Sequence, residues 1–134
     1  MNISQAARQS GLSAKTIRYY EDIGLIPLAA RGENGYRQYE GDALEQLQFL
    51  ARARDVGFDL EECRQLLALQ QDRGRQSRHA RELVLQKSSQ LQQRIEQLME
   101  MQKVLEDMAS RCRGDEGPEC AILEDLSNVE GSAQ

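Results

Sequence analysis

The stretch Ser13-Ala-Lys-Thr-Ile-Arg-Tyr-Tyr-Glu-Asp-Ile-Gly24 decides the fold of the N-terminal part of this chain. A helix is predicted over residues 14–22, because Ser13 is a good N-cap and Ile17 and Tyr20 stand three residues apart on one face. Gly24 suits the left-handed backbone position that ends such a helix. The stretch therefore predicts one short amphipathic helix with clear start and stop signals.

A second short helix is predicted just before it, over residues 3–9. Ala7, Gly11 and Ile17 have the spacing that two closely crossing helices need. The small residue sits at the crossing, the glycine makes the turn, and the branched residue locks the second helix. The pattern predicts a helix-turn-helix.

The outer face of the second helix is expected to carry Lys15, Arg18 and Tyr19. A helix of this kind fits the major groove of DNA, where arginine reaches a guanine edge and lysine reaches a phosphate. The alternative on this spacing alone is a helical hairpin with a solvated outer face.

The segment Ala30-Arg-Gly-Glu-Asn-Gly-Tyr-Arg-Gln-Tyr39 predicts a wing, that is, a hairpin of very short strands. Asn34-Gly35 is a strong two-residue turn signal, because both residues tolerate positive φ. Tyr39 is expected to turn into the core. The side chains expected to face a phosphate backbone are Arg31, Tyr36 and Arg37.

Two more helices are predicted over residues 42–54 and from Asp59, as the N-cap, to Gln71. The inward face of the first is expected to consist of Leu44, Leu47, Leu50 and Ala51. Cys63 has no neighbouring metal-binding side chain in the sequence, so we interpret it as a half-buried structural thiol. These helices complete a small domain without room for an internal substrate pocket.

Residues 72–76 are expected to form a linker, after which Ser77 is expected to cap a long helix that ends near Arg111. Its apolar residues recur in alternating steps of seven, four and three, which is a heptad seam. About 35 residues give a helix of about 52 Å, too long to be buried against this small domain. The helix therefore predicts an antiparallel homodimeric coiled coil with the seam Val84, Leu91, Ile95, Leu98, Leu105 and Ala109.

The tail Cys112-Arg-Gly-Asp-Glu-Gly-Pro-Glu-Cys120 brackets a loop with two thiols. Its glycines and proline let the loop curl so that both sulfurs meet. Two sulfurs without an obvious third ligand suit a soft monovalent ion, Cu(I), or by the same argument Ag(I) or Au(I). Zn(II) normally takes four ligands and should be rejected. The side chains expected to shield the sulfurs from water are Ile122, Leu123 and Leu126.

Other interpretations of the tail stay open. The two thiols could form a labile disulfide that senses redox state, or they could be unrelated. The chain could also buffer copper without regulating genes. His79 could serve as a third ligand, but its place near a helix start favours a surface role. A sensor of a divalent ion or a drug is disfavoured by the two-ligand set and the scarcity of aromatic residues.

Composition limits the remaining classes of protein. The 134 residues carry 17 basic and 22 acidic groups, for a net charge of −5. Residues 1–40 carry five basic and four acidic groups, whereas residues 104–134 carry two and eight, so the acidity is concentrated in the tail. An acidic total therefore does not exclude DNA binding by the N-terminal part. The chain has one histidine and no nucleophile motif, so an enzyme is not expected.

No apolar run is long enough to span a membrane, and Met1-Asn-Ile-Ser4 does not start a signal peptide, so we expect a cytoplasmic protein without a membrane partner.

Three N-terminal motifs resemble the MerR family of bacterial transcription regulators: Thr16-Ile-Arg-Tyr-Tyr-Glu-Asp-Ile-Gly-Leu-Ile26, Glu33-Asn-Gly-Tyr-Arg-Gln-Tyr39 and Val56-Gly-Phe-Asp-Leu60. The Cys112–Cys120 loop followed by Ala-Ile-Leu-Glu-Asp-Leu, together with Ser77, resembles the copper-efflux regulator (CueR-type) branch. The resemblance covers residues 1–127.

The resemblance implies a nucleoid-associated bacterial homodimer that binds a palindromic operator within a promoter. Metal binding would bend and untwist the DNA so that RNA polymerase can engage its two elements, which activates copper-efflux genes. The implied metal ligands are Cys112 and Cys120, with Ser77 and Arg81 of the partner protomer beside them. The implied DNA contacts are Lys15, Arg18, Tyr19, Arg31, Tyr36 and Arg37.

The expected fold is mainly all-α. A winged helix-turn-helix DNA-binding domain over residues 1–71 is followed by the linker over 72–76, a dimerisation helix over 77–111, a metal-binding loop with a short helix over 112–127, and a disordered tail over 128–134.

Overall fold

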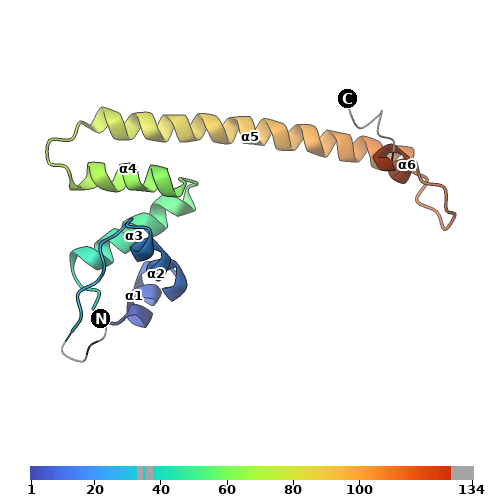
Figure 1. Cartoon of the computed structure of the whole chain (residues 1–134). Helices are drawn as coiled ribbons and strands as arrows, with labels where there is room; N and C mark the ends of the chain where they lie inside the picture. Colours follow the sequence, from blue (N-terminus) through green and yellow to red (C-terminus); the bar gives the residue numbers. More distant parts are fainter. Residues whose placement is uncertain (33–34, 36–37, 128–134) are drawn as a thin grey trace. The chain divides into compact units, whose positions relative to one another are not determined.

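The structure, a computed structural model, describes residues 1–32, 35 and 38–127. These residues form six α-helices and no strand (Figure 1). The chain divides into two compact units, Met1–Lys87 and Ser88–Gln134. The expected disordered tail, residues 128–134, lies outside the described residues. The helices are α1 (Ile3–Ser10), α2 (Ala14–Asp22), α3 (Asp42–Asp55), α4 (Leu60–Gln71), α5 (Ser77–Arg111) and α6 (Ala121–Ser127).

The first two helices begin and end at the residues whose chemistry favours caps. Asn2 and Gln5 form a reciprocal capping box at the start of α1, and Gly11 follows its end with a left-handed φ of 82°. The Ser13 hydroxyl accepts a hydrogen bond from the Thr16 amide at 3.0 Å. Gly24 lies just beyond α2 with a φ of 73°. The predicted cap and stop signals of α2 are therefore confirmed.

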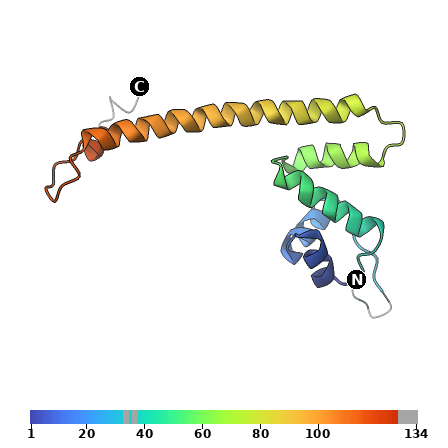
Figure 2. The same ribbon diagram turned by 180° about the vertical axis from the view of Figure 1, so that it is seen from behind.

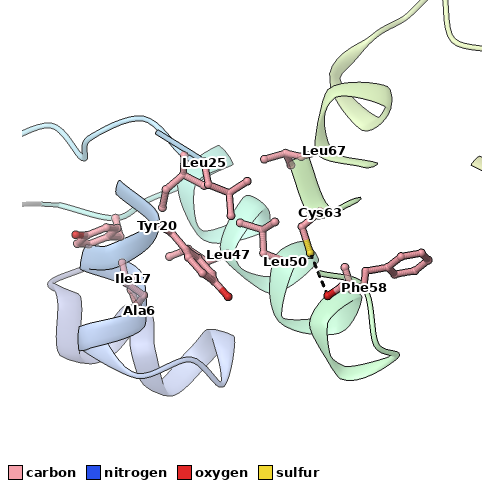
Figure 3. Packing of buried hydrophobic residues seen from close by; sticks show 12 residues of the cluster. Ala6, Ile17, Tyr20, Leu25, Leu47, Leu50, Phe58, Cys63 and Leu67 are labelled. Carbon is pink, nitrogen blue, oxygen red and sulfur yellow. Dashed lines mark hydrogen bonds between the residues drawn. The ribbon is translucent and has the colours of Figure 1, made fainter. Parts of the chain in front are cut away.

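The core of the first unit is built from residues of α1, α2, α3 and α4 and of the segments that join them, and Figure 3 shows it gathered around Leu47 and Leu50 of α3. Ile17 is fully buried and Tyr20 is 4% exposed, as their spacing predicts. Tyr39 is 1% exposed, which confirms that it turns into the core. The described core also includes residues that the sequence analysis did not single out, among them Leu25, Ile26 and Phe58.

The buried face of helix α3 differs slightly from the predicted one. Leu47 and Leu50 are fully buried, as expected, but the buried alanine is Ala53, and Leu44 and Ala51 are only half-buried. The prediction was wrong at Ala51 because α3 packs against α1 on one side and α4 on the other, so its buried stripe extends to a residue three positions beyond Leu50.

Cys63 of α4 is completely buried, whereas the sequence indicated a half-buried thiol. Its Sγ faces the Phe58 carbonyl oxygen at 3.9 Å (Figure 3). Burial raises the pKa of this thiol, and Arg54 opposes the shift. Cys63 is thus a small core residue whose reactive form is disfavoured.

The start of α5 packs on α4 within the first unit. The Lys87 Nζ pairs with the Glu62 Oε1 at 2.8 Å, and both side chains are mostly buried. Glu62 also forms a capping box with Asp59 at the start of α4, as the prediction of Asp59 as N-cap implies. Ser77 is the first residue of α5 and not the N-cap that we expected. The helix thus starts one residue earlier than the preference of serine for the N-cap position suggests.

Beyond Lys87, α5 continues as a helix of which no residue is buried. Helix α6 lies beside its C-terminal end (Figure 2). Among the described residues, no helix combines the length and apolarity that crossing a membrane requires.

Candidate DNA-binding surface and metal centre

Helix α2 presents a polar face opposite its buried one. Lys15 and Arg18 are exposed, and Tyr19 is 49% exposed, whereas Ile17 and Tyr20 are buried in the core. The amphipathic pattern therefore places the three predicted DNA contacts of this helix on one accessible surface. That surface has the size and chemistry of a helix that enters a major groove.

The predicted wing is a loop in the described residues, which contribute no strand to it. The Gln38 amide donates a hydrogen bond to the Ala30 carbonyl at 2.8 Å, and Gly35 has a φ of 81°. Arg31 is exposed, and its Nη1 donates to the Gly35 carbonyl at 2.7 Å. One such pairing is too short for strands to form. Tyr36 and Arg37 lie outside the described residues.

The two ends of this loop meet one buried carboxylate. The Glu21 side chain, on α2, accepts hydrogen bonds from the Ala29 amide at 2.9 Å and from the Tyr39 hydroxyl at 2.6 Å. Sequence reasoning missed Glu21, because an acidic residue near the end of an amphipathic helix is usually solvent-facing.

The two tail cysteines lie together. The Cys112 Sγ and Cys120 Sγ are 3.3 Å apart, and both side chains are partly exposed. Cys112 directly follows α5, and Cys120 directly precedes α6. The two helix ends thus bring together a pair of thiols that the sequence separates by seven residues, so both can contact a single soft ion.

The Cys120 sulfur lies where backbone amides favour its charged form. Hydrogen bonds from the Leu123 backbone amide, the Cys112 thiol and the Ile122 backbone amide lower the pKa of Cys120, against partial burial and the Glu124 charge. A lowered pKa increases the thiolate fraction at neutral pH, and thiolate is the form that binds metal.

The loop between the cysteines closes through its own polar side chains. Gly114 has a φ of 66°, a conformation that L side chains rarely adopt. The Gly117 amide donates to the Asp115 Oδ1 at 2.9 Å, and Arg113 pairs with Glu119 at 2.9 Å. These contacts are exposed, so they shape the loop without making it rigid.

An ion pair joins the two helices that flank the loop. The Arg111 Nη2, at the last residue of α5, lies 2.5 Å from the Asp125 Oδ2 of α6 and 3.2 Å from the Asp107 Oδ2. The hydrogen bond to Asp125 is the main cause that raises the pKa of Arg111. Sequence reasoning missed this pair, since opposite charges fourteen residues apart carry no local signal.

The expected apolar shield is only partly present in one chain. Ile122 is half-buried, but Leu123 and Leu126 are 62% and 64% exposed. Their expected shielding role was wrong for the single protomer, because seven helical residues that are packed at one end turn only one face inward.

The remaining candidate residues lie at the start of α5. Ser77, His79 and Arg81 are all exposed, and His79 lines a shallow groove between α4 and α5. Among the described residues, no group of three or more His, Cys, Asp or Glu side chains has an arrangement that could hold a metal ion.

Comparison with known families agrees with this arrangement. Residues 1–70 match the family model described as MerR HTH family regulatory protein, and residues 44–108 match the model described as MerR, DNA binding. The chain belongs to the MerR family. The predictions of a helix-turn-helix DNA-binding regulator and of a protein that is not an enzyme are therefore confirmed.

Individual relatives of this MerR-family chain are similar over nearly its whole length. The HTH-type transcriptional regulator HmrR of Rhizobium leguminosarum bv. viciae is 48% identical, with 96% of this chain and 98% of the relative covered. The HTH-type transcriptional regulator CueR of Salmonella typhi is 42% identical, with 95% and 92% covered.

A solved relative has the same fold as this MerR-family chain. The structure of the transcription regulator PbrR691 from Ralstonia metallidurans CH34, in complex with lead(II), superimposes with a TM-score of 0.81. It is 30% identical, with 95% of this chain and 99% of that one covered. The similarity to this lead(II)-bound regulator therefore covers nearly the whole chain.

Proposed function

We propose that this chain is a Cu(I)-responsive activator of transcription that binds a palindromic promoter as a homodimer. The observation that carries the proposal is the 3.3 Å approach of the Cys112 and Cys120 sulfurs at the end of the long helix of a MerR-family regulator. The same two-thiolate site would also bind Ag(I) or Au(I), because these monovalent ions prefer the same soft ligands.

The donor set supports a monovalent ion. Two thiolates and one +1 ion leave a single negative charge, whereas a divalent ion normally takes additional ligands. Among the described residues, no third His, Cys, Asp or Glu side chain joins the pair. The backbone amides of Leu123 and Ile122 stabilise the remaining charge at Cys120.

The long helix supports a homodimer. Its heptad seam is open to solvent in one chain, with Leu91, Ile95 and Leu98 each 45–48% exposed. An uncovered apolar stripe on a helix of this length is unfavourable in water unless a second helix covers it. An antiparallel second copy would cover it and would bring Ser77 and Arg81 of the partner protomer toward the metal loop.

The exposed face of α2 supports operator binding. Lys15, Arg18 and Tyr19 would contact the major groove, and Arg31, Tyr36 and Arg37 of the wing would contact phosphates. Because a homodimer carries two such surfaces, its operator would be a palindrome.

Regulation then requires two dimer geometries. The ion shifts the equilibrium toward the one that it binds more tightly. In that geometry the dimer would distort the promoter so that RNA polymerase engages both of its elements, which is a form of readout through DNA shape.

A second candidate is a sensor of a divalent heavy metal. It is favoured by the lead(II) complex of PbrR691, a relative that is 30% identical. Ser77 argues against this candidate, because a divalent sensor would gain from another thiolate near that position. A redox switch is a further candidate, since the 3.3 Å separation of two partly exposed thiols would also suit a reversible disulfide.

The test is an anaerobic titration of the reduced, full-length protein with Cu(I) against a Cu(I) chelator, with Zn(II) and Pb(II) in parallel. We expect uptake of one Cu(I) per protomer, its loss in Cys112→Ser, and its retention in the matched thiol control Cys63→Ala. Tighter binding of Pb(II) would favour the divalent sensor, and failure to compete for Cu(I) would contradict the proposal.

The link to transcription is tested with the same variants. We expect Cys112→Ser and Cys120→Ser to keep operator binding and to lose metal-induced transcription by RNA polymerase in vitro. Loss of operator binding in either variant would contradict this division of roles. Copper uptake without any sequence-selective DNA binding would instead indicate a copper-buffering protein.

A further inference from the structure

Glu21 connects the recognition helix α2 to both ends of the wing. Its Oε2 accepts a hydrogen bond from the Ala29 amide at 2.9 Å, where the wing begins, and its Oε1 accepts one from the Tyr39 hydroxyl at 2.6 Å, where the wing ends. The Gln38 amide bonds to the Ala30 carbonyl at 2.8 Å and closes the base of the loop. One side chain thus holds the start and the end of an eleven-residue segment.

The connection is sheltered from water. Glu21 is 5% exposed and Tyr39 is 1% exposed. Hydrogen bonds to a buried carboxylate are among the stronger ones in proteins, and removal of one partner leaves the other unsatisfied. Among the described residues, no buried polar side-chain atom lacks a partner. The carboxylate is therefore a fixed anchor and not a surface contact that solvent can replace.

We propose that Glu21 is a positioning residue that sets the direction of the wing relative to the recognition helix, so that both contact one operator half-site. The inference rests on the proposed DNA-binding role of α2 and the wing, and adds a residue that itself touches no DNA. The wing that Glu21 positions would contact the phosphate backbone beside the bases that α2 contacts.

The physical basis is preorganisation. Phosphate contacts fix the register of a protein on DNA, and they contribute fully only when the basic groups are held in place before binding. Arg31 lies in the wing, two residues from Ala29. If the wing is released at its base, it has to become ordered when DNA binds, and the entropic cost of that ordering weakens binding. The contacts of α2 remain available.

Two substitutions separate this role from a general effect on folding. Tyr39→Phe removes one hydrogen bond to Glu21 and keeps the buried ring. Glu21→Gln keeps both bonds, because its amide oxygen can accept from the Ala29 amide and its amino group can donate to the Tyr39 hydroxyl. The matched control is Tyr20→Phe, which removes the hydroxyl of a buried tyrosine that faces Arg54 and not the wing.

The probe is a duplex that the wild-type dimer selects from a random pool, and affinity is measured over a range of salt concentrations. For Tyr39→Phe we expect about tenfold weaker binding and a salt slope smaller by about 1–2, since each of the two wings loses about one phosphate contact. Phosphate-ethylation interference should disappear at the wing contacts and persist beside α2. Glu21→Gln and Tyr20→Phe should retain the wild-type slope.

Amide hydrogen exchange in the free protein provides the structural readout. In Tyr39→Phe the Ala29 amide should exchange faster, while the amides of α1 and α3 keep their protection. Weaker binding with an unchanged salt slope and uniformly reduced interference would indicate a merely structural role and overturn the proposal. Wild-type affinity and slope in Tyr39→Phe would overturn it too.

The DNA-binding proposal itself fails in a different way. If the wild-type dimer selects no duplex from the pool, the operator function is wrong and the role of Glu21 is overturned with it. If the wild type selects a duplex and only Tyr39→Phe behaves unexpectedly, the operator function stands and the positioning role alone is rejected.

Discussion

Arg111 and Asp125 join the end of the long helix to the short helix that follows the thiol loop, with their Nη2 and Oδ2 atoms 2.5 Å apart. Cys112 and Cys120 lie between these two residues in the chain, one directly after α5 and one directly before α6. The ion pair therefore closes the same loop that the two sulfurs would close around a metal ion.

Arg111→Gln should weaken metal binding and leave operator binding unchanged. The pair is partly exposed, with side-chain exposures of 47% and 35%, so its contribution is small and the affinity loss should be at most about fivefold. The measurement is the Cu(I) competition titration. Arg113→Gln is the matched control, because among the described residues Arg113 pairs with Asp115 and Glu119 of the exposed loop. Equal effects of the two substitutions would contradict a specific role for Arg111.

Arg18→Ala should weaken operator binding and leave metal affinity unchanged, because Arg18 lies on the exposed face of α2 in the first unit. Loss of an arginine contact to a base edge costs about 1–3 kcal/mol and relaxes specificity at that base pair. Fluorescence anisotropy with the selected duplex provides the measurement. Arg52→Ala, at an exposed position in the last turn of α3, is the control. A similar loss of operator affinity in both variants would indicate that Arg18 contributes only nonspecific electrostatic attraction to DNA.

The three thiols should react at different rates with iodoacetamide. Burial raises the pKa of Cys63 and leaves the side chain fully inaccessible, whereas backbone hydrogen bonds lower the pKa of Cys120. A lower pKa means more thiolate at neutral pH, so Cys120 should be alkylated first and Cys63 last. Peptide mass spectrometry after timed quenching measures the order. Rapid labelling of Cys63 in the native protein would contradict the described core.

Raising the pH tests the cause of that order. The thiolate fraction of a cysteine rises until the pH passes its pKa, so the rate at Cys120 should level off at a lower pH than the rate of a small free thiol measured in parallel. Bound Cu(I) should protect Cys112 and Cys120 together.

Leu98→Glu should convert the dimer to monomers, because it places a charge in the centre of the seam that a second helix would cover. Gln97→Glu is the matched control, since it introduces the same charge one residue away and outside the seam. Sedimentation velocity distinguishes the two outcomes. A stable Leu98→Glu dimer would show that another surface holds the protomers together.

The helices could be predicted because their signals are local. Ser13 and Gly24 bracket α2 with the chemistry that caps a helix, and the structure confirms both ends. The approach of Cys112 to Cys120 also has a short-range cause, since the glycines between them allow the loop to curl. The error at Ser77 has the same origin, because capping preferences fix a helix boundary only to within one or two residues.

The burial of individual side chains could not be predicted in the same way. A heptad or a 3.6-residue period gives the middle of an apolar face but not its width, so the burial of Ala51 and of Cys63 was predicted wrongly. The exposure of Leu123 and Leu126 depends on what packs against α6, and periodicity does not contain that information.

The sequence alone determined the order of the helices, the helix-turn-helix, the exposed face of α2 and the pair of thiols, because each follows from residues less than about ten positions apart. Only the tertiary structure decided that Glu21 anchors the wing and that Arg111 reaches Asp125. Charged side chains can form hydrogen bonds and ion pairs with residues far away in the sequence once packing has brought the backbones together. Which backbones come together is a property of the folded chain and not of any short segment.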